Sequence, residues 1–294
     1  MKARRIRRHA WVMAKLAELV ARRSTSFART LPTVFILGAT KSASTSLTNM
    51  LWHHPAHVSA FAKELMYLQQ LPNFENQWEF RRSVAFVWGR ISNGHARYSL
   101  AGYRKFFPLK LHMLLRAISQ GQAVTSECDP FNLYCPTAQR RIEAFAKDPR
   151  FIISMRNPID RAYSDYNMHA TRMDERRSFE QCIEDELSGR ETQFRKQFLN
   201  QSVYEPHVRR WIEAFGRERF LILKAEDLFA DPERAAAEMF RFLNLPDAPT
   251  DLTPTNTGRY AAKLSTDTRA RLAEYFAPHN ERLFDLVGWK HDLD

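Results

Sequence analysis

The chain has 294 residues, of which 44% are apolar, 12% aromatic and 26% charged. This composition favours a globular protein with one sizeable core or two small ones, and it excludes disordered, collagen-like and disulfide-scaffold classes. The net charge of +11 suggests a polyanion partner, but residues 1–30 hold nine lysines and arginines against one glutamate. The other 264 residues hold 35 basic and 32 acidic side chains, so the body is nearly balanced.

Residues 1–30 form a basic N-terminal extension in which the pattern over 9–21 predicts a helix. Two interpretations of this helix remain open. It is either solvated or packed on a partner, or it lies on the anionic inner face of a membrane. The extension has no clean apolar segment of the kind that a secretory signal carries. The three cysteines have no zinc or CxxC spacing, which is typical of reduced thiols in a cytoplasmic protein.

The body, residues 31–294, is predicted to be one domain in which strands alternate with helices. Continuous apolar runs at 33–37, 151–155 and 220–223 are typical of buried parallel strands. Helices are expected at 47–53, at 160–168 behind an Asn157 N-cap and Pro158, at 232–244, and at 266–286, the last bent near Pro278. This order predicts an α/β fold with a central parallel sheet flanked by helices in three layers.

The segment between the first strand and its helix has the composition of a phosphate-binding loop. Small and hydroxylated side chains let an anion approach the backbone at a helix N-terminus, and Lys41 adds a cation. The loop is not a Walker A motif, because no glycine precedes the lysine. The candidate ligands of the anion are Lys41, Ser42, Ala43, Ser44, Thr45 and Ser46.

Two later segments add candidate anion contacts. Arg156 follows the second strand and can make charge-assisted bonds to phosphate, and Ser164 lies two turns into the next helix. Arg161 between them has an i, i+4 partner in Asp165 and is interpreted as structural. Near the C-terminus, a small-residue loop carries Gly258, Arg259 and Tyr260.

These three motifs, in this order, resemble those of sulfotransferases that use 3′-phosphoadenosine 5′-phosphosulfate (PAPS), and most closely the carbohydrate and heparan-type branch with its bacterial relatives. The resemblance implies a P-loop-like fold in which the Lys41 loop holds the 5′-phosphosulfate. It also implies that Arg156, Ser164 and the loop at 258–260 hold the 3′-phosphate and nucleotide. The resemblance further implies that no metal is required and that the product is adenosine 3′,5′-bisphosphate.

The segment Lys63-Glu64 resembles the Lys-Glu segment of carbohydrate sulfotransferases, whose glutamate is the general base. Glu64 is therefore the expected base, Lys41 the group that stabilises charge on the leaving oxygen, and Lys63 a residue that positions the sulfuryl group or tunes Glu64. His53 and His54 are competing bases, because the other branch of the family uses a histidine.

The acceptor side is expected to include Glu127, Asp129 and Tyr204, by resemblance to acceptor segments of the same family. The acceptor is expected to be a carbohydrate, glycolipid or lipid alcohol; the sequence does not specify which, and it leaves the oligomeric state open. A P-loop kinase or NTPase is the second interpretation, and a nucleic-acid-binding module, suggested by charge alone, is the third. The usual nucleic-acid motifs are lacking, so no nucleic-acid partner is expected.

Overall fold

A computed structural model describes residues 14–15, 17–69, 99–173, 175–249 and 263–289. Gly258, Arg259 and Tyr260 lie outside these residues, as do residues 70–98. Among the described residues, no helix is long and apolar enough to cross a membrane.

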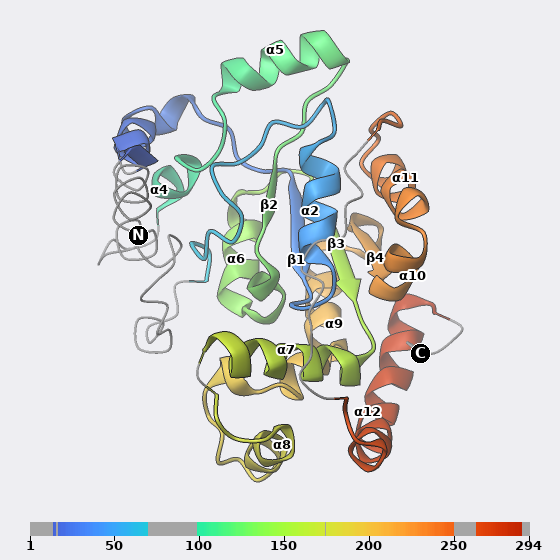
Figure 1. The fold of residues 1–294 in the computed structure, drawn as a ribbon. Helices are drawn as coiled ribbons and strands as arrows, with labels where there is room; N and C mark the ends of the chain where they lie inside the picture. The colour runs from blue at the N-terminus through green and yellow to red at the C-terminus, as the bar shows by residue number, and fades with distance from the viewer. Residues whose placement is uncertain (1–13, 16, 70–98, 174, 250–262, 290–294) are drawn as a thin grey trace, which may run out of the picture.

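A four-stranded parallel sheet lies at the centre of the fold, in the order β2-β1-β3-β4 (Figure 1). The strands are β1 (Val34–Gly38), β2 (Ser126–Cys128), β3 (Arg150–Met155) and β4 (Phe220–Lys224). Because all four strands are parallel, their carboxyl ends meet at one edge, where ligands of α/β sheets commonly bind. The three predicted strands are confirmed, and the parallel α/β architecture with them.

Helices cover both faces of the sheet, because alternate residues of each strand point to opposite sides. Val34 and Ile36 of β1 pack with α2 (Ser44–Trp52) and α11 (Pro232–Phe242). Phe35 and Leu37 point the other way, toward α6 (Pro136–Phe145), α9 (Glu205–Phe215) and α12 (Thr266–Val287). The result is the expected three-layer arrangement.

The remaining helices lie around these layers. α7 (Pro158–Arg172) follows β3, and the Asn157 side chain accepts hydrogen bonds from the N–H groups of Ile159 and Asp160, which confirms the predicted cap. Helix α12 runs continuously through Pro278 and ends before Gly288, which has a φ of 76°. The others are α4 (Leu100–Arg104), α5 (Lys110–Gln120), α8 (Phe179–Leu187), α10 (Ala225–Ala230) and short 3-10 turns at Ser26–Ala28, Pro130–Tyr134, Phe194–Lys196, Asn200–Ser202 and Arg217–Arg219.

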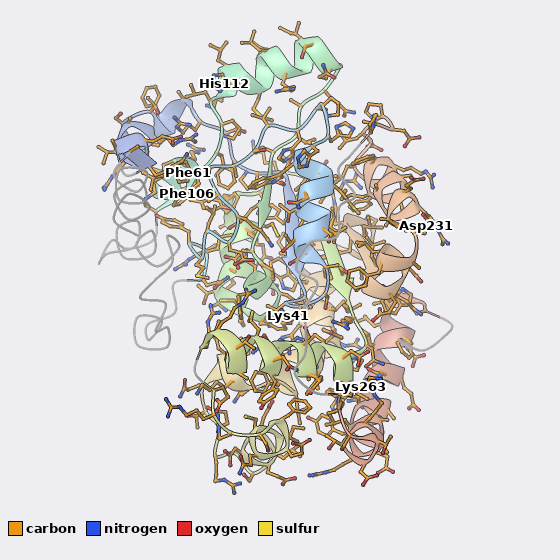
Figure 2. All side chains as sticks on the ribbon, in the orientation of Figure 1. Lys41, Phe61, Phe106, His112, Asp231 and Lys263 are labelled. Atoms are coloured by element: carbon orange, nitrogen blue, oxygen red, sulfur yellow. The ribbon has the colours of Figure 1, made fainter. Side chains whose placement is uncertain are left out.

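The described part of the N-terminal extension packs on the body. Leu19 is buried in the main core, and the Lys15 and Arg22 cations lie over the Phe61 ring. The Arg29 guanidinium donates to the Phe107 carbonyl at 2.8 Å. Figure 2 shows Phe61 and its neighbour Phe106 on the side of the molecule where this segment lies. The sequence did not predict this packing on the chain's own body. Whether 1–30 is a separate unit, and whether it contacts a membrane, stay predictions.

Candidate functional site

The loop after β1 presents an open helix N-terminus at the carboxyl edge of the sheet. Lys41 and Ala43 both have left-handed backbone conformations, with φ of 64° and 63°. Ala43 is the N-cap residue of α2, and among the described residues no side chain caps this end. The first N–H groups of a helix need acceptors and carry the positive end of its dipole, so they suit an anion.

The six candidate ligands in this loop differ in accessibility. Ser42 and Ser44 are buried, whereas Lys41, Ala43, Thr45 and Ser46 are partly open to solvent. The Lys41 ammonium lies 3.9 Å from the Met168 sulfur of α7, and Figure 2 shows Lys41 between the loop and that helix. The loop therefore exposes a cation, hydroxyls and the helix terminus on one side, toward α7.

A fully buried arginine, Arg161, holds this loop against α7. Its guanidinium donates to the Thr40 carbonyl at 3.2 Å and to the Thr40 hydroxyl at 2.7 Å, and it forms an ion pair with Asp165. Further bonds reach the Phe198 carbonyl and Ser202. The structural interpretation of Arg161 is thus confirmed. The sequence pointed only to Asp165, because the other partners are distant along the chain.

The segment after β3 lies beside the loop, since β1 and β3 are neighbours and the Ala39 N–H donates to the Ser154 carbonyl at 2.5 Å. Arg156 is half-buried at the end of β3, and Ser164 is 6% exposed on α7. The Tyr204 hydroxyl donates to the Arg156 carbonyl at 3.0 Å. The structure therefore brings the first two motifs together.

Lys63 and Glu64 lie at the first turn of α2. The Lys63 ammonium donates to the Thr45 hydroxyl at 2.6 Å and approaches the Glu64 carboxylate at 3.3 Å. The Glu64 side chain is 44% exposed, and its backbone N–H donates to the Cys128 carbonyl at 2.8 Å. A partly exposed carboxylate is therefore linked to the open helix terminus through a single side chain, that of Lys63.

Asp129 anchors the segment that carries Glu64. Its carboxylate accepts from the Met66 N–H at 2.8 Å and from the Gln69 amide at 2.9 Å. The backbone at Glu64 and Met66 is left-handed, with φ of 56° and 52°, which side chains other than glycine rarely adopt. Burial, with the nearby Glu64 charge, raises the pKa of Asp129 to about 6. The sequence did not predict this positioning contact.

Glu127 and Tyr204, expected on the acceptor side, are buried in the structure. The Tyr103 hydroxyl donates to the Glu127 carboxylate, and burial, with Asp129 close by, raises the pKa of Glu127 to about 8. Tyr204 is 1% exposed beneath Arg156. In this arrangement both side chains, like Asp129, contact protein groups, and their roles toward an acceptor stay predictions.

The competing histidines lie at the opposite end of α2 from the loop. His53 follows the last residue of the helix, and a ring nitrogen of His54 lies 2.9 Å from the Pro246 carbonyl. A nine-residue helix is about 13 Å long at ~1.5 Å per residue. Glu64, and neither histidine, is therefore the candidate base beside the open helix terminus.

The sequence matches the sulfotransferase domain family over residues 31–277. The chain belongs to the sulfotransferase family. It is 23% identical to mouse carbohydrate sulfotransferase 15, over 89% of this chain and 55% of that protein, and so spans about half of that relative. It is 22% identical to mouse heparan sulfate glucosamine 3-O-sulfotransferase 5, over 88% of this chain and 72% of that one.

Among solved structures, this chain is similar to a sulfotransferase from Alicyclobacillus acidocaldarius. The TM-score is 0.70 at 23% identity, over 88% of this chain and 96% of the other. The family resemblance inferred from the three motifs is therefore confirmed. The sulfotransferase interpretation is thereby favoured over a P-loop kinase and over a nucleic-acid-binding module.

Proposed function

We propose that this sulfotransferase moves the sulfuryl group of PAPS to a hydroxyl or amine of a carbohydrate-class acceptor, with Glu64 as general base. The observation that carries the proposal is the Lys63–Thr45 bond, which ties the Lys63-Glu64 pair to the open N-terminus of α2. A proton acceptor and an anion-binding helix end then share one site. In-line group transfer needs this combination of charge stabilisation, positioning and a base.

The residues present fit the nucleotide. The left-handed backbone at Ala43, the uncapped helix and the exposed side of the loop suit the 5′-phosphosulfate, with Lys41 and Lys63 as cations. Arg156 and Ser164 would hold the 3′-phosphate. When bound, PAPS supplies a sulfuryl group whose S–O bond to the phosphate breaks as a bond to the acceptor oxygen forms, leaving adenosine 3′,5′-bisphosphate.

The chain's own residues provide the base, the charge stabilisation and the positioning. Glu64 takes the proton of the acceptor hydroxyl, while Lys41 stabilises negative charge on the leaving side. Lys63, bonded to Thr45 and Glu64, keeps the carboxylate directed at the helix terminus. Asp129 holds the backbone of the same segment. No metal enters this scheme, so we expect full turnover in the presence of EDTA, whereas a magnesium-dependent kinase would lose its activity.

A carbohydrate acceptor is supported by the names of the relatives, which are carbohydrate and heparan sulfate sulfotransferases. Glycolipids and lipid alcohols carry the same hydroxyl chemistry and belong in the same screen. We propose a cytoplasmic location, supported by three buried cysteines that are free thiols. Radiolabelled sulfate transfer onto a glycan extract and a lipid extract, assayed separately, distinguishes the acceptor classes.

Binding of adenosine 3′,5′-bisphosphate tests the nucleotide half of the proposal. A ligand of the native state raises its stability by mass action, about 2.7 kcal/mol at a hundred times Kd. We expect a rise in the thermal midpoint that grows with ligand concentration, and a matching calorimetric heat. Adenosine 5′-phosphate, which lacks the 3′-phosphate, is the control. An unchanged midpoint at millimolar ligand refutes nucleotide binding.

Glu64→Gln tests the base. The substitution keeps the size of the side chain and removes the proton acceptor, so we expect turnover to fall by about 10²–10⁴ with nucleotide affinity unchanged. Glu233→Gln, an exposed glutamate on α11, is the matched control. Near wild-type turnover in Glu64→Gln refutes the assignment. If Glu64→Gln also loses nucleotide binding, Glu64 belongs to the nucleotide site and is not assigned as the base.

A further inference from the structure

Helix α5 carries its apolar side chains on the outside. Leu111, Leu114, Leu115 and Ile118 recur at helical spacing along one stripe, and each has more than half of its surface exposed, between 55% and 73%. The opposite stripe faces the body, where the Arg116 guanidinium donates to the Pro55 carbonyl at 2.7 Å. A surface helix normally turns its apolar stripe inward, so this orientation marks an interaction surface.

The charges around this stripe are basic. Helix α5 carries the exposed Lys110 and His112, has Arg116 on the side that faces the body, and contains no acidic residue. The N-terminal segment joins it directly, because Arg29 bridges to Leu109 and the Thr30 N–H donates to the Pro108 carbonyl at 3.0 Å. Arg29 and Thr30 therefore lie next to the start of α5, and they end a sequence segment, residues 1–30, that holds nine basic side chains and one acidic.

The same N-terminal segment adds exposed apolar side chains. Val20 is 72% exposed and Phe27 is 75% exposed. Aliphatic and aromatic side chains together with basic ones are what an anionic lipid surface binds, because the apolar groups enter the acyl boundary while the cations meet the phosphates. A second copy of the chain fits less well, since two such faces would bring like charges together.

We propose that α5, with the adjoining segment 17–30, is a docking surface for an anionic lipid bilayer. Contact through 1–30 alone was one interpretation of the sequence; the structure adds a helix far along the chain as the apolar element. Figure 2 shows His112 on α5 at the top of the molecule and Lys41 well below it, near the centre of the view. Docking through α5 therefore leaves the nucleotide loop open, and lipid binding can be measured independently of catalysis.

Sedimentation of the full chain with vesicles tests the surface. The probes are vesicles of phosphatidylcholine alone and of phosphatidylcholine with phosphatidylglycerol in equal parts. We expect binding to the anionic vesicles and little to the neutral ones. Leu111→Gln, Leu114→Gln and Ile118→Gln together should lower the partition coefficient about tenfold or more, since the buried apolar area falls. Their side chains are exposed, so the thermal midpoint should stay unchanged.

Two further variants separate the contribution of the surface cations from that of exposed apolar side chains in general. Lys110→Gln combined with Arg23→Gln should weaken binding to anionic vesicles by removing surface cations. Phe229→Gln, an equally exposed apolar side chain on α10, should bind as the wild type does. Wild-type binding by the α5 triple variant overturns the proposal, as does a failure of the wild type to bind anionic vesicles. Light scattering that shows a dimer, converted to monomer by the triple variant, overturns it in favour of a second copy.

Discussion

Replacing Glu127 with glutamine should remove part of the fall in the free energy of unfolding that the wild type undergoes as the pH rises. The Glu127 carboxyl is fully buried and accepts from the Tyr103 hydroxyl, and burial, with Asp129 close by, raises its pKa to about 8 from 4.5. In the unfolded chain the same group ionises near its ordinary pKa. Its contribution to stability is therefore fully present below pH 4.5 and is lost as the pH rises toward 8.

The size of the effect follows from linkage. Between the two pKa values the unfolded state releases a proton that the folded state keeps, which lowers the free energy of unfolding by about 1.4 kcal/mol for each pH unit. Glutamine cannot ionise and can still accept from Tyr103. From pH 5.5 to 7.5, Glu127→Gln should therefore gain about 2.7 kcal/mol relative to the wild type, because that interval spans two pH units.

Urea unfolding at pH 5.5, 6.5 and 7.5 measures this difference. At each pH the free energy of unfolding of the variant is compared with that of the wild type. The difference removes the contribution of every titrating group that does not interact with Glu127. Glu233→Gln, at an exposed position, should run parallel to the wild type. A Glu127→Gln curve that also runs parallel refutes the reasoning. It would mean that Glu127 is ionised in the folded protein and available as a charged group beside Asp129.

Two other substitutions test contacts that hold the site. Arg161→Met should lower the free energy of unfolding by about 3–5 kcal/mol, because it leaves the Asp165 carboxylate buried without its partner. Breaking the exposed pair between Arg271 and Glu184 by Arg271→Met should change it by less than about 1 kcal/mol, and equal losses in urea unfolding would contradict the argument. Asp129→Asn should lower kcat about tenfold with nucleotide affinity retained, since an amide loses part of the bond to the Met66 N–H. A calorimetric loss of nucleotide binding in this variant would contradict a role confined to the base segment.

The parts of the fold that follow from local sequence were predictable. Strands β1, β3 and β4 are continuous apolar runs because both of their faces are covered, and Asn157-Pro158 marks the start of α7 by local chemistry. The small and hydroxylated side chains after β1 predicted a turn that opens a helix, and α2 begins there. These features depend on neighbours within a few residues.

Other features depend on where distant segments meet. The stripe along α5 is visible as a periodic pattern, but periodicity does not tell whether the stripe faces the core or solvent. Arg161 bonds Thr40 and Phe198, and Asp129 bonds Met66, across 37 to 121 residues of sequence. A single sequence without pairing information does not specify such partners. The sequence therefore yielded the candidate groups at the site and left out the contacts that position them.

The distribution of charge predicts different salt responses for the two proposed anion sites. At the lipid surface, exposed cations act at long range and are strongly screened, since the Debye length falls from ~10 Å at 0.1 M salt to ~3 Å at 1 M. At the loop, half-buried Arg156 and the N–H groups of α2 act at hydrogen-bond distance. Raising the salt from 0.1 to 0.5 M should therefore weaken vesicle binding far more than binding of adenosine 3′,5′-bisphosphate. Equal losses in the two titrations would show that the nucleotide, too, is held by diffuse surface charge.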